Sequence, residues 1–327
     1  MQPAVSVIMN CYNGSRHLRS ALRSLFAQSH CDYELVFYDN ASTDESPAIL
    51  QEVAASFEDR TRYVRGEQTV PLGAARNRAL AHARGRYIAF LDCDDLWLPE
   101  KLARQIALFE ANPKVGLVCT DTEIFDEERT VKRLFAESRP SRGMAFAELV
   151  ERQWISMSSA MLRREAMENL LEDSGGASPE KPRACFDEEL NVCEEADVFY
   201  RIAHDWELDY VDAPLTRWRV HGGNTTFGKF GQFAEETLYI LEKHRRLYPG
   251  YDAAHPNLVA LLTRRAAFQK GVALWREGRN AEARSSIAPW TGTSLKYRLF
   301  WWASFLPGQC FDRAARLYFS LPTALRR

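Results

Sequence analysis

The chain has 327 residues, enough for one large domain or two ordinary ones. Its hydrophobic fraction of 46% and charged fraction of 26% are typical of a globular protein, and a net charge of −2 gives no sign of nucleic-acid binding. Seven cysteines are spread singly without Cys-x-x-Cys spacing, which argues against a zinc site and favours the reducing cytoplasm. We expect neither a signal peptide nor a membrane-spanning segment, because no apolar run approaches the roughly 18–20 residues that a bilayer requires.

Strand-like and helix-like segments alternate over the first 120 residues. Short apolar runs predict strands at 5–9, 35–38, 63–64, 87–91 and 116–120. Helical spacing and helix-start residues predict helices between them, at 15–28, 48–57, 73–83 and 100–110. This alternation predicts an α/β protein with a doubly wound, mostly parallel sheet covered by helices.

The rest of the chain has a less regular pattern. A loop rich in Gly, Ser and Pro is expected at 173–182, and a helical stretch follows near 194–204. From about residue 233 the pattern is mostly helical, with a helix pair over 266–290 that turns at 278–280. The segment 125–143 is expected to be an irregular loop.

An acidic cluster follows the strand predicted at 87–91. Its carboxylates belong to Asp92, Asp94 and Asp95, and they repel one another at a strand end unless a cation neutralises them. Residues two apart in an extended segment point to the same side, so Asp92 and Asp94 can face one point. Their hard oxygen atoms suit Mg²⁺ or Mn²⁺. The alternative interpretation is a solvated acidic turn.

Three polar residues end predicted strands. Asn10, Asp39 and Asp92 follow the first, second and fourth of them. In open parallel sheets, ligands bind outside the carboxyl ends of the strands. We therefore expect these side chains to border one ligand site.

Six motifs occur in an order that resembles a known family. They are VSVIMNCYN (5–13), YDNASTD (38–44), GAARNRAL (73–80), DCDD (92–95), CEEADVFYR (193–201) and RVHGGN (219–224). With them, residues 4–225 resemble inverting nucleotide-sugar glycosyltransferases of family 2, which have the GT-A fold. The resemblance implies a GT-A catalytic domain over 1–225 and a mostly helical region over 226–327.

The resemblance places the donor nucleotide at the first two strand ends. Asp39 is expected to accept a hydrogen bond from N3–H of a uracil ring, and Asn10, Tyr12 and Asn13 to lie beside the base. An Asx turn or helix cap is the alternative role for Asp39. Arg76 is expected to bind the diphosphate, because a guanidinium is a planar fork of donors. The alternative is a solvated helix arginine, the role expected for Arg78.

The acidic cluster resembles the DxD motif of the family and implies a Mn²⁺ or Mg²⁺ cofactor. Asp92 would face the ribose or the metal shell, and Asp94 would bind the metal. Asp95 would support or share this coordination. The resemblance brings His221 close to the metal or the diphosphate, and an imidazole can bind Mn²⁺ or, when protonated, pair with phosphate.

Glu195 aligns with the catalytic base of the family, which is usually an Asp. It would take the proton from the attacking acceptor hydroxyl, and Glu194 is the second candidate. The alternative is that acidic residues in the first turn only stabilise the helix dipole. Asp197 and Arg201 are four residues apart and are expected to pair along the helix.

The predicted function is metal-dependent, inverting transfer of a sugar from a nucleotide-diphosphate sugar, most often UDP-linked, to a saccharide or lipid-linked saccharide in cell-surface polysaccharide synthesis. A catalytically inactive scaffold relative stays open, because Glu195 replaces Asp. A sugar-phosphate nucleotidyltransferase also stays open, although residues 10–14 lack the lysine of its phosphate loop. The basic, aromatic segment 296–327 is expected either to contact the inner face of the cytoplasmic membrane or to pack on the catalytic domain.

Overall fold

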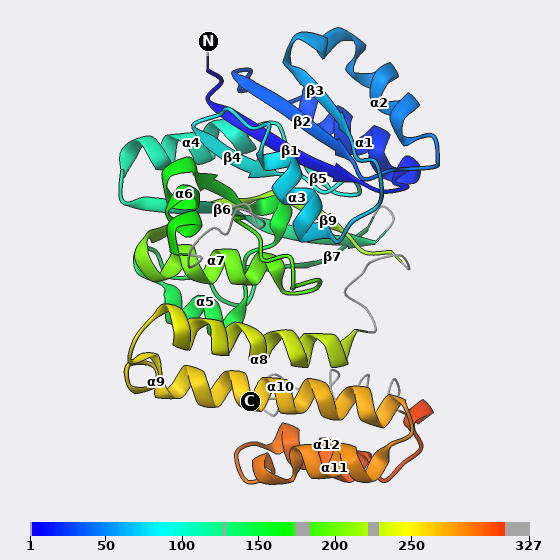
Figure 1. Ribbon diagram of the computed structural model, residues 1–327, viewed down its shortest axis with the longest axis vertical. Coiled ribbons are helices and arrows are strands. Elements are labelled where there is room, and N and C mark those ends of the chain that lie inside the picture. Colours follow the sequence, from blue (N-terminus) through cyan, green and yellow to red (C-terminus); the bar gives the residue numbers. More distant parts are fainter. Residues whose placement is uncertain (1, 127–128, 174–183, 222–228, 311–327) are drawn as a thin grey trace. The chain divides into compact units, whose positions relative to one another are not determined.

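The computed structural model describes the chain except for residues 1, 127–128, 174–183, 222–228 and 311–327 (Figure 1). It divides into two compact units, 1–223 and 224–327. Three predicted segments lie partly outside the described residues. They are the loop expected at 173–182 from residue 174 on, the end of the motif at 219–224 and the last part of the segment 296–327.

Unit 1 is built on one mixed sheet whose strand order is β3-β2-β1-β4-β8-β6-β9-β5, with β7 paired to β6. Strands β1 to β4 are parallel to one another, while β8 runs antiparallel between β4 and β6. The strands are β1 Val5–Cys11, β2 Tyr33–Asp39, β3 Thr61–Arg65, β4 Tyr87–Phe90, β5 Leu96–Trp97, β6 Val115–Asp126, β7 Arg129–Arg133, β8 Met161–Arg163 and β9 Glu207–Arg219. The predicted doubly wound, mostly parallel sheet is confirmed.

Helices connect the parallel strands, as the alternating pattern predicts. All seven residues of β2 are buried, which is expected of a strand covered on both faces. Leu18, Leu22 and Leu25 line the buried side of the first helix at helical spacing. The helices of unit 1 are α1 Ser15–Phe26, α2 Ser46–Ala54, α3 Leu72–Leu80, α4 Lys101–Ala111, α5 Phe146–Arg152, α6 Arg164–Asp173 and α7 Glu194–Asp205.

The second half of the sheet departs from the predictions. Residues 125–143 do not begin as an irregular loop, because β6 continues to Asp126 and β7 returns along it as a hairpin. Strand β8 has three residues, too few to show a period of two. It is nevertheless central to the sheet, where it joins β4 to β6.

Unit 2 is helical over its described residues. Its helices are α8 Phe230–Leu247, α9 Tyr251–Ala254, α10 Pro256–Arg276, α11 Asn280–Ile287 and α12 Leu295–Ala303. The predicted turn at 278–280 is confirmed, and Gly278 adopts a φ of +80° that favours glycine. Val272, Trp275, Ile287 and Phe300 belong to its core. Among the described helices of the chain, none combines the length and the apolar character that crossing a bilayer requires.

Candidate active site

The carboxyl ends of β2, β1 and β4 lie side by side in unit 1. Cys11 pairs with Asp39 across β1 and β2, and Ile8 pairs with Phe90 across β1 and β4. Asn10 and Asp39 therefore reach the same edge of the sheet as the acidic loop that follows β4. Within the described part of the chain, the buried Nδ2 atom of Asn10 has no hydrogen-bond partner. A buried donor of this kind is a natural contact for a ligand.

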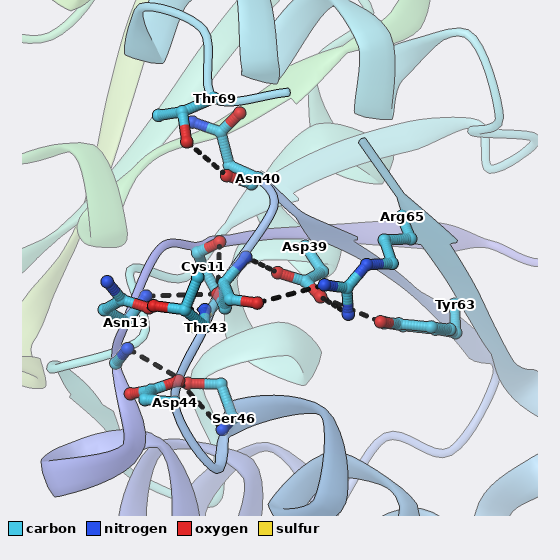
Figure 2. A network of polar contacts seen from close by, with 12 residues as sticks. Cys11, Asn13, Asp39, Asn40, Thr43, Asp44, Ser46, Tyr63, Arg65 and Thr69 are labelled. Atoms are coloured by element: carbon cyan, nitrogen blue, oxygen red, sulfur yellow. Dashed lines mark hydrogen bonds and ion pairs between the residues drawn. The ribbon is translucent and has the colours of Figure 1, made fainter. Parts of the chain in front are cut away.

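Asp39 is fully buried, and Arg65 lies beside it (Figure 2). Its Oδ1 atom accepts the backbone N–H of Ser42 at 2.7 Å, and its Oδ2 atom accepts the hydroxyl of Tyr63 at 2.8 Å. Arg65 donates to Oδ2 at 3.2 Å, and its side chain is 52% exposed. Burial and the neighbouring carboxylate raise the pKa of Tyr63, so its hydroxyl stays a donor. Tyr63 and Arg65 therefore both donate to Oδ2 of Asp39.

The polar residues around Asp39 brace the loops of this site (Figure 2). Asn40 forms two hydrogen bonds with the backbone of Val70, at 2.8 and 3.0 Å. Asn13, in a left-handed conformation with φ of 50°, accepts the N–H of Thr43 at 2.8 Å. Tyr12 is exposed, so its ring is accessible to a ligand. The side chain of Asn13 is thus bound to the loop at Thr43, whereas the side chain of Tyr12 is exposed.

Arg76 joins two acidic segments that are far apart in the sequence. Its side chain is only 2% exposed, and it donates to Glu194 at 2.7 Å and to Asp92 at 3.4 Å. The carboxylate of Glu195 lies 3.9 Å away. Although burial opposes it, these three carboxylates raise the pKa of Arg76. The alternative of a solvated arginine is therefore wrong for Arg76, while Arg78 is exposed as expected.

The acidic loop presents its carboxylates in different directions. Oδ2 of Asp94 lies 2.9 Å from Nε2 of His221, and both side chains are partly exposed. Asp95 is buried and accepts Ser158 Oγ at 2.6 Å and the N–H of Arg219 at 2.9 Å. Desolvation, followed by repulsion from its acidic neighbours, raises the pKa of Asp95. The structure thus brings Asp94 to His221 and directs Asp95 elsewhere.

The side chains of Asp92, Asp94 and His221 offer atoms of the kind that bind a divalent ion. Carboxylate oxygens from Asp92 and Asp94 and an imidazole nitrogen from His221 are ligand types that Mn²⁺ accepts. Desolvation and the neighbouring Asp94 raise the pKa of Asp92, so this loop carries negative charge that a cation would relieve. Within the described residues, no three His, Cys, Asp or Glu side chains converge closely enough to enclose an ion. If an ion binds here, Asp92, Asp94 and His221 are the residues that would hold it.

Two glutamates begin α7 in different surroundings. Glu194 is buried, and its Oε1 atom accepts a hydrogen bond from Arg76, while its Oε2 atom has no hydrogen-bond partner within the described part of the chain. Glu195 is 36% exposed, yet desolvation by its surroundings, reinforced by Glu194 and Asp92, raises its pKa to about 8. That Glu195 is the catalytic base stays a prediction.

The predicted ion pair within α7 is confirmed. Arg201 donates to Oδ2 of Asp197 at 2.8 and 3.0 Å, and both side chains are buried. Asp197 is therefore a partner of Arg201 in the interior of unit 1. The acidic side chain at position 197 is therefore explained by the buried ion pair within α7.

Sequence reasoning missed the partners that complete this site. Tyr63 and Arg65 cover Asp39, and Ser158 and Arg219 hold Asp95. Arg65 directly follows the strand predicted at 63–64, and this strand lies beside the one that ends at Asp39. Its position after the strand could have indicated that it reaches the site. Ser158 lies in a segment without a recognisable pattern, and nothing local pointed to it.

Residues 6–171 match the model of the family described as Glycosyl transferase family 2. The chain belongs to this family. It is 39% identical to EpsE of Bacillus subtilis over 125 residues, which are 38% of this chain and 45% of EpsE. It is 31% identical to WfgD of Escherichia coli over 135 residues, which are 41% of this chain and 52% of WfgD. The chain thus spans about half the length of these two relatives.

Solved structures confirm the GT-A fold. Staphylococcus aureus TarS 1–349 in complex with UDP-GlcNAc matches with a TM-score of 0.59 at 16% identity, covering 91% of this chain and 90% of that one. The mannosyltransferase PcManGT from Pyrobaculum calidifontis, in complex with GDP-Man and Mn²⁺, matches with a TM-score of 0.60 at 20% identity, covering 100% and 83%.

Replacing the buried guanidinium tests whether it holds the acidic segments together. We expect Arg76→Gln to lower the free energy of unfolding by about 3–5 kcal/mol, because it leaves the buried carboxylate of Glu194 without its cation. Arg78→Gln, on the exposed side of the same helix, removes one hydrogen bond to Tyr38 and should lower it by about 1 kcal/mol. Urea unfolding followed by tryptophan fluorescence measures both, and equal losses in the two variants would contradict the role of Arg76.

Proposed function

We propose that this family 2 glycosyltransferase uses a divalent metal ion and inverts the transferred sugar, moving it from a UDP-sugar to an acceptor hydroxyl. Arg76 is the observation that carries the proposal. It contacts Asp92 of the acidic loop and Glu194 at the start of α7. The family resemblance assigns the first segment to the donor diphosphate and the second to the base. Their meeting around one buried cation supports a single site for both.

The acidic loop is the proposed diphosphate site. Asp92, Asp94 and His221 would hold the ion, which when bound would offset the negative charge that builds on the departing diphosphate. Asp95 fixes this loop through Ser158 and the backbone of residue 219. We therefore propose Asp95 as a positioning residue.

Glu195 is the proposed general base. Its carboxylate takes the proton of the acceptor hydroxyl while the hydroxyl oxygen forms a bond to the anomeric carbon. The bond from that carbon to the diphosphate breaks on the opposite face, and one such displacement inverts the centre. A pKa of about 8 lies near the pH at which a base works well. Glu194 stays bound to Arg76 and orients it.

The proposed acceptor is a saccharide, free or lipid-linked, in cell-surface polysaccharide synthesis. WfgD is named a UDP-Glc:alpha-D-GlcNAc-diphosphoundecaprenol beta-1,3-glucosyltransferase, which supports a lipid-linked acceptor for this chain. Unit 2 exposes Trp302, Phe305 and Leu306 around the end of α12. Aromatic and apolar side chains of this kind suit the membrane interface, so we include a peripheral membrane contact in the proposal.

The base assignment predicts a specific response to substitution and pH. We expect Glu195→Gln to lower kcat roughly 100- to 10,000-fold, because the amide cannot take a proton. Glu195→Asp keeps the carboxylate and should retain much more activity than Glu195→Gln. Because the wild-type residue must lose its proton, kcat/KM should rise about tenfold per pH unit below its pKa of about 8 and level off above it.

Release of diphosphate nucleotide from a UDP-sugar measures these rates. Unchanged turnover in Glu195→Gln would reject the base assignment. Absence of turnover in the wild type with every nucleotide sugar supplied would favour the scaffold relative instead.

The proposal gives Asp94 and Asp95 different roles, one as a metal ligand and the other as a positioning residue. We expect Asp94→Asn to raise the Mn²⁺ concentration needed for half-maximal activity on the order of 100-fold, since it removes a ligand. Asp95→Asn should mainly lower the melting temperature, because the carboxylate of Asp95 accepts hydrogen bonds from Ser158 and from the backbone N–H of Arg219. Manganese titrations and thermal melts of both variants decide this, and the reverse pattern would overturn the assignment.

The base-reading role of Asp39 is tested with a methylated nucleotide. If the carboxylate accepts N3–H of uracil, N3-methyl-UDP should bind about tenfold or more weakly than UDP, since a hydrogen bond to a charged group contributes roughly 1.5–3 kcal/mol. Asp39→Asn should abolish most of this preference. Calorimetric titration measures it, and equal affinities of wild type for the two nucleotides would exclude Asp39 as the reader of the base.

A further inference from the structure

Two cysteine thiols meet beneath the acidic loop. Cys11 is the buried last residue of β1, and Cys93 is half-buried between Asp92 and Asp94. Strands β1 and β4 are parallel neighbours, and the N–H of Leu91 still donates to β1 at 3.0 Å after β4 has ended. The chain therefore carries Cys93 past the end of β1, where Cys11 lies.

The two thiols lie close together. Both sulfur atoms also lie against Gly14, where an added Cβ atom would be 2.8 Å from the sulfur of Cys93 and 2.9 Å from that of Cys11. Gly14 has a φ of −96°, which any residue adopts, so its backbone conformation does not require glycine. Glycine is needed at this position because the two sulfur atoms fill the space that a Cβ atom would occupy.

We propose that Cys11 and Cys93 form an oxidisable dithiol site, whose disulfide disables the acidic loop. A peroxide is the proposed oxidant. It converts the more accessible Cys93 thiol to a sulfenic acid and releases one water. The Cys11 thiol then attacks that sulfur, an S–S bond forms, the S–O bond breaks and a second water leaves. Two thiols lose two electrons and two protons, which the peroxide takes up, and an external dithiol reverses the step.

A disulfide at this place changes the geometry of the loop. An S–S bond measures about 2.05 Å, so forming one would draw residue 93 toward the end of β1. Asp92 and Asp94 are its immediate neighbours and move with it. Their positions relative to Arg76 and His221 then change. The loss of transfer activity rests on the function proposed above, whereas the pairing of the thiols does not.

The full chain, treated with hydrogen peroxide and digested without reduction, tests the site by peptide mass mapping. We expect a peptide pair joined through Cys11 and Cys93, two mass units lighter than the sum of the free peptides. Turnover should fall at least tenfold and return after dithiothreitol. Cys31→Ser, which removes an exposed thiol outside the site, should behave like the wild type. Cys11→Ser should form no cross-link and leave a sulfenic acid on Cys93 that dimedone traps.

Each remaining outcome counts against the proposal. If Cys31 is oxidised while Cys11 and Cys93 stay unlinked in the wild type, the proposed dithiol site is wrong. This outcome is measured on the wild type, so it does not depend on whether a variant folds. If the cross-link forms and turnover is unchanged, the disabling of the acidic loop is wrong. Because the mass map is independent of activity, a wild type without transferase activity would reject the proposed function and leave the thiol pairing to be judged by its own measurement.

Discussion

Unit 1 depends on the buried guanidinium of Arg76. More carboxylates surround it than its single positive charge can neutralise. Burying an arginine costs several kcal/mol unless it is paired, and the partners of Arg76 come from the loop after β4 and from the start of α7. Asp92 is 16 residues away from Arg76 in the sequence, and Glu194 is 118 residues away. The packing of α3, the acidic loop and α7 is therefore coupled through one side chain.

One cation cannot balance the carboxylates gathered around it. Desolvation and mutual repulsion raise the pKa of Asp92, and they raise that of Glu195 to about 8. The same surplus of negative charge has two chemical consequences. In the proposed function it would favour a divalent ion beside Asp94 and His221, and it would give Glu195 the basicity that proton transfer from a hydroxyl needs. The proposed metal site and the proposed base would thus be two effects of one electrostatic imbalance.

The sequence was most informative where a local pattern decides the structure. Apolar runs located the parallel strands, and the strand ends located Asn10, Asp39 and Asp92 at one edge. Spacing along a helix was enough to pair Asp197 with Arg201, because the two residues lie one turn apart. The insertion of the three-residue β8 between β4 and β6 was not predictable in this way, since so short a strand has no detectable period.

Hydrogen-bond partners were harder to predict, because they depend on which distant segments meet. Asp95 belongs to the acidic motif by sequence, yet its carboxylate is held by Ser158, 63 residues away, and by the backbone of residue 219, 124 residues away. Only the folded sheet shows that it faces these groups while its neighbour Asp94 faces His221. Adjacent acidic residues therefore differ in role because of what lies opposite each one.

The hydrogen bonds of Asp39 show which contacts the proposed nucleobase would exchange. A fully buried carboxylate requires partners, and here Ser42, Tyr63 and Arg65 supply them. The first two donors are held by a tight turn and by a neighbouring strand, whereas the arginine is half-exposed and also donates to the backbone oxygen of Ser42 at 3.1 Å. In the proposed function, an N–H group of the base that replaces Arg65 would leave the carboxylate with two of its three donors unchanged. Base binding at this position would then be an exchange of one donor, which burial of Asp39 permits as long as Ser42 and Tyr63 stay in place.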